Sequence, residues 1–81
     1  MPVVLRVDGF AFKFYSGDHD PPHVHVRYGG TGAVIDIATG HVRSSAMRQP
    51  DLARACALVR DHRDALLSAW LAWKLNREGT A

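Results

Sequence analysis

The spacing of the apolar residues changes near the middle of the chain, and this change constrains the fold more than any other feature. Phe10, Phe12 and Phe14 alternate with other residues, as in a strand that buries one face. After Pro50 the apolar residues recur at helical spacing: Leu52, Cys56, Val59, Leu66, Trp70 and Trp73. The sequence therefore predicts an α+β fold with strands first and helix last.

The expected sheet has four strands and is mostly antiparallel. Asp8-Gly9 is a strong two-residue turn signal and predicts a hairpin. The expected strands, within a strand region of residues 3–43, are Val3 to Val7, Phe10 to Tyr15, His23 to Tyr28 and Gly32 to Ile37. A short piece around His41 to Arg43 is left unassigned.

One long helix is expected over about residues 50–75, because neither Gly nor Pro interrupts this segment after Pro50. It should pack across one face of the sheet and leave residues 76–81 as a frayed tail. The 81 residues allow a single domain, 1–81, whose core supports roughly 3 to 5 kcal/mol. The single cysteine, Cys56, excludes an intramolecular disulfide, so a partner, a metal or good packing must add stability.

The chain is expected to be cytoplasmic and to have no contact with a membrane. Its first residues do not resemble a signal peptide, and no run of eighteen apolar residues occurs. A single thiol fits a reducing compartment. Ten basic residues against eight acidic ones, a net charge of +2, permit an RNA partner without requiring one.

The alternation also predicts two different faces of the sheet. If the three phenylalanines face the helix, then Leu5, Val24, Val26 and Tyr28 do so as well. The opposite face then carries Arg6, Lys13, Tyr15, His23, His25 and Arg27. A slip by one residue would bury both histidines together with Arg27, which a small core could hardly tolerate. We therefore expect a polar, basic, solvent-reachable face, with His19 at its rim.

Three of the five histidines, His19, His23 and His25, lie within seven positions beside Pro21-Pro22. His23 and His25 would project side by side and can act as general base and general acid on an RNA phosphodiester. Phosphate would be held by Arg6, Lys13 and Arg27, and Tyr15 would stack on a base. The candidate catalytic residues are therefore His23 and His25, and the candidate phosphate-binding residues are Arg6, Lys13, Tyr15, His19 and Arg27.

Two other interpretations of the histidines stay open. We expect no cofactor; the alternative is zinc or another divalent metal bound by His19, His23 and His25, with Asp18 or Asp20 as an oxygen ligand. In the structural interpretation, Pro21-Pro22 fixes the entry into the third strand and a histidine closes the loop by a hydrogen bond.

The order of these motifs resembles a known bacterial family, domain of unknown function 4160. The resemblance rests on Pro-Pro-His-Val-His-Val at residues 21–26 and on a helix with Leu-Val-x-x-His-Arg, and it covers about Met1 to Trp73. Such proteins are often encoded beside a protein of the family domain of unknown function 2442. The resemblance therefore implies a toxin–antitoxin-like gene pair and a partner protein, and it implies no established activity.

Two functions follow as expectations. The first is a component of a two-gene system that acts by forming a complex with its neighbour's product. The second is a small RNA-cleaving or phosphate-binding toxin that uses the histidine-rich face. Whether the protein is an enzyme is left open, and a homodimer is a further possible assembly because such a sheet has exposed edges.

Overall fold

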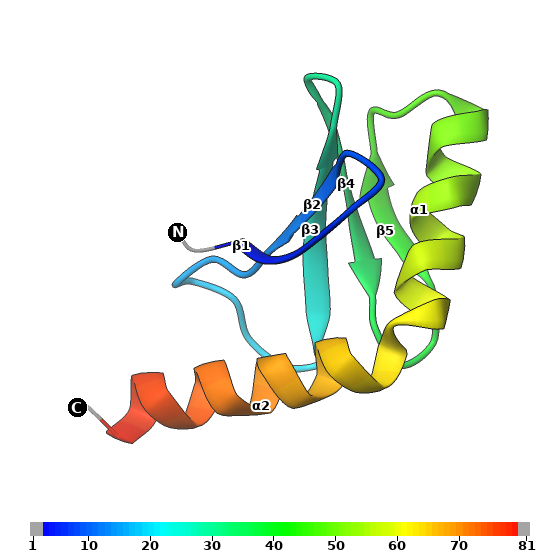
Figure 1. Cartoon of the computed structure of the whole chain (residues 1–81). Coiled ribbons are helices and arrows are strands. Elements are labelled where there is room, and N and C mark those ends of the chain that lie inside the picture. Colours follow the sequence, from blue (N-terminus) through cyan, green and yellow to red (C-terminus); the bar gives the residue numbers. More distant parts are fainter. Residues whose placement is uncertain (1–2, 80–81) are drawn as a thin grey trace.

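The computed structural model describes residues 3–79, with side chains described up to residue 76. It contains five strands and two helices (Figure 1). In chain order these are β1 (Val3–Val7), β2 (Phe10–Lys13), β3 (His23–Tyr28), β4 (Thr31–Asp36), β5 (Val42–Ser45), α1 (Gln49–Asp61) and α2 (Arg63–Gly79). The α+β class with an antiparallel sheet is confirmed, whereas the expected numbers of strands and helices are wrong.

The sheet is an antiparallel meander with the strand order β1-β2-β3-β4-β5. Asp8 and Gly9 turn the first hairpin with φ values of 52° and 83°, and positive φ at both positions is the signature of a type I′ turn. The sequence pattern does not predict β5, because this strand is only four residues long, is mostly exposed and contains a single apolar residue, Val42. A register shift between Val34 and Ile35 further weakens its pattern.

The predicted single helix is in fact two helices that meet at His62. Its backbone leaves helical geometry, with φ −109° and ψ 21°, and its ring Nδ1–H donates to the Leu58 carbonyl oxygen at 2.9 Å. Figure 1 shows the result: α1 runs alongside the sheet, and α2 turns away to cross the sheet's lower end. The helical residues continue to Gly79, where α2 ends, and thus extend into the segment 76–81 that was expected to be a tail; residues 80–81 lie outside the described residues.

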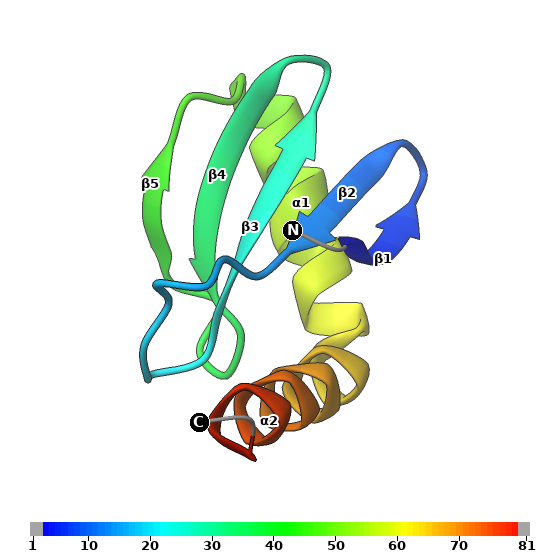
Figure 2. The ribbon, with the colours of Figure 1, turned by 90° about the vertical axis from the view of Figure 1, so that its left-hand side faces the viewer.

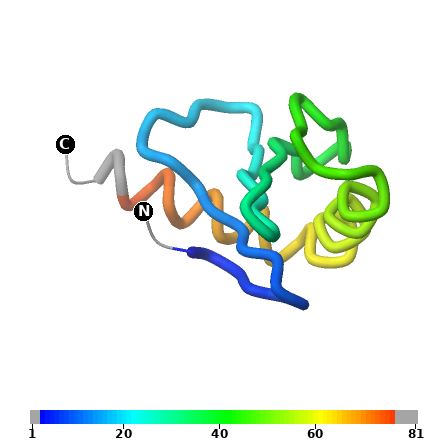
Figure 3. The backbone as a smooth tube through the Cα atoms, turned by 90° about the horizontal axis from the view of Figure 1, so that it is seen from above, coloured from blue at the N-terminus to red at the C-terminus, as the bar shows by residue number. Residues whose placement is uncertain are grey.

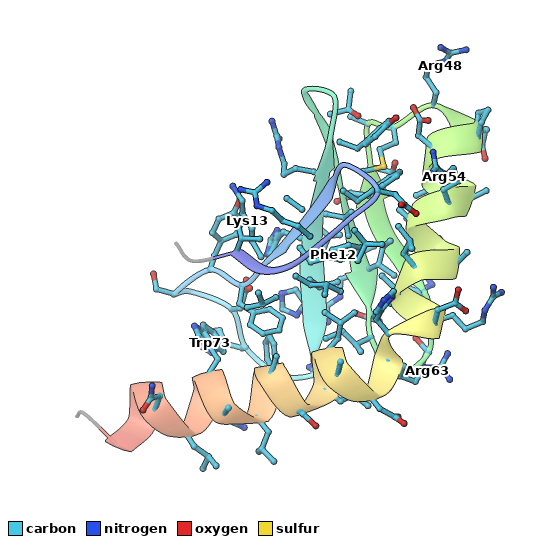
Figure 4. All side chains as sticks on the ribbon, viewed as in Figure 1. Phe12, Lys13, Arg48, Arg54, Arg63 and Trp73 are labelled. Carbon is cyan, nitrogen blue, oxygen red and sulfur yellow. The ribbon has the colours of Figure 1, made fainter. Side chains whose placement is uncertain are left out.

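The core lies between the sheet and the two helices, and the predicted inward register is confirmed. The described residues that are almost completely buried include Phe10, Phe12, Phe14, Val24, Val26, Ile35, Ile37, Val59, Leu66 and Trp70. Figure 4 places Phe12 between the sheet and α1, and the next residue, Lys13, points away from that layer. Tyr28 stacks on Phe10 with 4.1 Å between ring centroids. The apolar side of the sheet is thus buried against the two helices.

Within residues 3–79, the other side of the sheet carries no helix. Figure 2 shows α1 behind the sheet and α2 across its lower end, with the remaining face toward the viewer. The segment between β2 and β3 forms a wide arc (Figure 3) and passes over the lower part of this face (Figure 2). We call residues 15–22 the histidine loop. Within residues 3–79, neither helix is long and apolar enough to cross a bilayer.

Candidate functional site

The histidine loop places a carboxylate over the start of β3. A tight turn forms at its beginning, because Tyr15 N–H donates to Asp18 Oδ2 and Asp18 N–H donates to the Tyr15 carbonyl, both at 2.9 Å. Ser16-Gly17-Asp18 is a sequence of typical turn residues, whose short polar side chains bond nearby backbone groups. The turn holds Asp18 above the uncovered face of the sheet.

Asp18 meets both histidines of β3. Its Oδ1 atom lies 3.2 Å from His23 Nε2 and 3.0 Å from His25 Nε2. Successive strand residues of equal parity project to the same side, so His23 and His25 stand together, with 5.5 Å between their ring centroids. The three potential ligand atoms all lie within 4.8 Å of one another. We call Asp18, His23 and His25 the Asp–His cluster.

The carboxyl group of Asp18 is ionised at neutral pH. Burial by itself raises the pKa of Asp18, but the hydrogen bond from Tyr15 N–H and the interactions with His25 and His23 outweigh burial, so the pKa is lowered overall. The Asp–His cluster therefore contains a charged acceptor beneath the surface, since Asp18 is only 9% exposed and His23 only 5% exposed.

The tautomer of His23 is fixed by the backbone. Its Nδ1 lies 3.0 Å from the Pro21 carbonyl oxygen, which can only accept, so Nδ1 carries a proton. The same oxygen accepts a hydrogen bond from an Arg43 terminal nitrogen at 3.3 Å. Because Nδ1–H is directed at Pro21, the Nε2 atom of His23 is the ring nitrogen that faces Asp18.

The second helix holds the histidine loop in place. The indole N–H of Trp70 donates to Asp20 Oδ1 at 3.1 Å, and Lys74 pairs with Asp20 Oδ2. The Trp70 ring also packs against His23, at 5.3 Å between centroids. Phe14 in turn contacts Trp70 and Trp73, and Figure 4 shows Trp73 directed from α2 toward the sheet. Loop, strand and helix thus meet at one point.

An open groove lies next to the Asp–His cluster on the uncovered face. Its volume is about 540 Å³, and its lining includes Tyr15, His25, Arg27, Val34 and Ser44. A Cβ at Gly32 would come within 3.3 Å of an Arg27 terminal nitrogen, so the glycine leaves room for the guanidinium group. Tyr15 packs on the His25 ring at 4.3 Å between centroids. The groove therefore has an aromatic, a basic and an imidazole group within reach of a single ligand.

The predicted site residues are only partly brought together. His25 remains accessible, with 23% of its side chain exposed, and Lys13 is its cross-strand neighbour. Arg6 and Arg27 are both exposed. They lie on β1 and β3, and Ala11 of the intervening strand β2 pairs with each of them, so the two arginines are one strand apart.

One expectation about the histidines is wrong. His23 faces the predicted side of the sheet but is buried rather than solvent-reachable, because the histidine loop and Trp70 cover it. His19 is exposed and is not a member of the Asp–His cluster. The Asp–His cluster thus contains Asp18, His23 and His25 of the expected metal set and leaves out His19.

Comparisons with known proteins place the chain in a family. A family model described as Domain of unknown function (DUF4160) matches residues 9–71, which are 63 of the 81 residues. No curated protein matches the chain, and no solved structure does. The matched segment contains the complete Asp–His cluster and the Asp20–Trp70 contact. The protein therefore belongs to the DUF4160 family.

Proposed function

We propose that this protein acts by forming a complex with a partner protein, as one component of a toxin–antitoxin-like two-gene system. The observation that carries the proposal is the exposure of Leu71 and Leu75, at 56% and 59%, on α2. Together with Tyr15 these are the exposed large apolar side chains among residues 3–76. A partner surface would remove both leucines from water.

The geometry of α2 supports this proposal. Leu67, half-buried, precedes the two leucines by one and two helical turns, so the three follow the i, i+4, i+8 spacing used when a helix lies in a groove of its partner. We call Leu67, Leu71 and Leu75 the leucine stripe. The outer part of α2 extends beyond the sheet (Figure 1), where a second protein can reach it.

Co-expression with the product of the neighbouring gene tests the proposal. The double substitution Leu71→Glu with Leu75→Glu should abolish co-elution in size-exclusion chromatography with light scattering. The isolated variant should keep the wild-type melting temperature, because surface substitutions typically change stability by about 0.5 kcal/mol or less. Ala72→Glu, an exposed position of the same helix, is the matched control and should leave the complex intact.

Two results would contradict this assignment. An unchanged complex with the double variant would exclude the leucine stripe as the contact surface. A homodimer of the isolated wild-type protein that dissociates in the double variant would assign the stripe to self-association instead of partner binding.

A second candidate function is binding of a phosphate-bearing ligand such as RNA, which the groove favours. His25, Arg27 and Tyr15 line it, and Lys13 lies opposite His25 on the neighbouring strand. Clustered basic groups give charge-assisted hydrogen bonds to phosphate, and tyrosine can stack on a base. The burial of His23 argues against the paired mechanism with two accessible histidines. RNA cleavage would therefore rely on His25, which Asp18 orients through one ring nitrogen.

RNA binding and cleavage are measured separately to test this candidate. Arg27→Ala should weaken binding of a short RNA, and Arg48→Ala, at an exposed position between β5 and α1 that does not line the groove, is the control for net charge. Cleavage should disappear in His25→Ala while the fold persists. An RNA affinity that Arg27→Ala and Arg48→Ala reduce equally would indicate nonspecific charge attraction and not a groove.

A further inference from the structure

Two neutral histidines cannot both donate a hydrogen bond to Asp18 in the Asp–His cluster. Asp18 Oδ1 is a carboxylate oxygen and faces two Nε2 atoms at 3.0 and 3.2 Å. His25 can meet it as a neutral ring with a proton on Nε2. His23 cannot, because its ring proton is on Nδ1, which faces the Pro21 carbonyl, so a neutral His23 places an unprotonated Nε2 3.2 Å from the carboxylate oxygen.

A bound cation removes this conflict. It would accept the lone pairs of both Nε2 atoms and the charge of Asp18, and both imidazoles would stay neutral. Two imidazoles and one carboxylate are the donor set of zinc and related first-row divalent metals.

We propose that Asp18, His23 and His25 form a binding site for a divalent first-row transition metal, with zinc as the ion to test first. In a tetrahedral zinc site with bonds of about 2.0 to 2.1 Å, neighbouring ligand atoms are roughly 3.3 Å apart. The contacts of 3.0 and 3.2 Å from Asp18 Oδ1 to the two ring nitrogens are close to this separation. All three donor atoms lie within 4.8 Å of one another, so modest movements bring them to the separations of a zinc site.

The surroundings of the Asp–His cluster are those of a metal site. A histidine ligand usually donates its other ring N–H to a carbonyl or carboxylate, which fixes the tautomer and the ring orientation, and His23 does so to Pro21. The second carboxylate oxygen of Asp18 accepts the Tyr15 N–H, as outer-shell partners of ligating carboxylates do. Each contact orients a donor atom toward the common centre.

Three protein ligands leave one position of a tetrahedral site for water or a bound ligand. His25 is the most exposed of the three and also lines the groove, so the ion would lie at the edge of that surface. The metal site is distinct from the leucine stripe on α2, so zinc binding can be tested independently of the proposed partner.

The test uses the complete chain without an affinity tag, stripped with a chelator that is then removed by dialysis. Zinc is added in an isothermal titration, and the histidine ring nitrogens are followed by NMR. We expect one zinc ion per chain and perturbation of His23 and His25 resonances, with those of His19 unchanged. Cobalt replacing zinc should give the visible absorption of a tetrahedral site.

Variants separate the site from adventitious binding. Asp18→Asn keeps an acceptor for the Tyr15 N–H but loses the negative charge. His25→Ala removes a ligand whose side chain is partly exposed and lies outside the core. Changes to outer-shell partners of a metal typically weaken its binding by about 10- to 100-fold. Each of these two variants changes a ligand itself, so each should weaken zinc binding by more than that. His19→Ala, in the same loop, should bind like the wild type. Circular dichroism confirms that each variant is folded.

Failure of zinc to bind the wild-type protein would overturn the proposal. Equal loss in His19→Ala, or no loss in folded Asp18→Asn and His25→Ala, would also overturn it. In each of these cases the Asp–His cluster would be a metal-free hydrogen-bonded clasp of the histidine loop.

Discussion

Replacing Asp20 with alanine should destabilise the protein far more than replacing it with asparagine. Asp20 accepts the indole N–H of Trp70 at 3.1 Å, and Trp70 is only 3% exposed. Alanine leaves this buried donor without its partner, whereas an asparagine Oδ1 can still accept it. Both substitutions remove the charge that pairs with Lys74. The comparison therefore separates the buried hydrogen bond from the ion pair.

The two contributions differ in size. An unsatisfied buried donor costs about 1 to 3 kcal/mol. The ion pair contributes only about 0 to 1 kcal/mol, because 31% of the Lys74 side chain and 52% of the Asp20 side chain are exposed. We expect Asp20→Ala to lower the free energy of unfolding by about 1 to 4 kcal/mol and Asp20→Asn by about 1 kcal/mol at most. For a domain of this size each kcal/mol lowers the melting temperature by about 4 to 8 °C.

Urea denaturation followed by circular dichroism and tryptophan fluorescence measures both variants. Lys74→Ala, which removes the ion pair and keeps the indole hydrogen bond, should match Asp20→Asn. Equal destabilisation by Asp20→Ala and Asp20→Asn would refute the reasoning, because it would mean that the indole hydrogen bond contributes nothing. Asp20→Ala should also weaken any zinc binding by the Asp–His cluster, since Trp70 packs on His23.

Two further predictions concern the sheet. Phe12→Ala should leave the protein unfolded, because truncating a fully buried Phe costs about 3 to 5 kcal/mol, comparable to the whole stability of a small domain. The control variant Lys13→Ala should melt near the wild-type temperature. If Phe12→Ala melted cooperatively at the wild-type temperature, the register would be contradicted. Gly9→Ala should cost about 1 to 2 kcal/mol, because φ of +83° is unfavourable for alanine and its Cβ would lie 3.3 Å from the Tyr28 ring. Equal stability of Gly9→Ala and wild type in the same denaturation would exclude strain at this turn.

The strands could be predicted where one face is buried and the turn chemistry is local. Phe10 and Phe12 of β2, and Phe14 just after it, are all buried, so the alternation is visible in the sequence. Asp8-Gly9 determines its turn without help from distant residues. The division of the helix at His62 could not be predicted. The segment around His62 contains no Gly or Pro. The bend accompanies a hydrogen bond from the His62 ring to the Leu58 carbonyl and the packing of α2 against the histidine loop.

The candidate site could be located but not assembled. Strand parity correctly placed His23 and His25 on the side of the sheet opposite the core. Their exposure depends on a loop whose path is determined by contacts with Trp70, Lys74 and Arg43, which are distant in sequence. For the same reason Asp18 could be named only as one of two possible oxygen ligands. A turn built from Ser16-Gly17-Asp18 is the local signal that favours it over Asp20.

The meander topology has a consequence for the order in which the molecule forms. Each strand pairs with the strand next to it in the chain, so the sheet needs only short loop closures, which are fast. The contact between Trp70 and Asp20 instead joins residues 50 positions apart. The sheet can therefore form first, while the histidine loop becomes immobile only when α2 docks. During synthesis the Asp–His cluster is completed after residue 70 has emerged from the ribosome, so an arrested or shortened chain would contain every ligand atom but not the site.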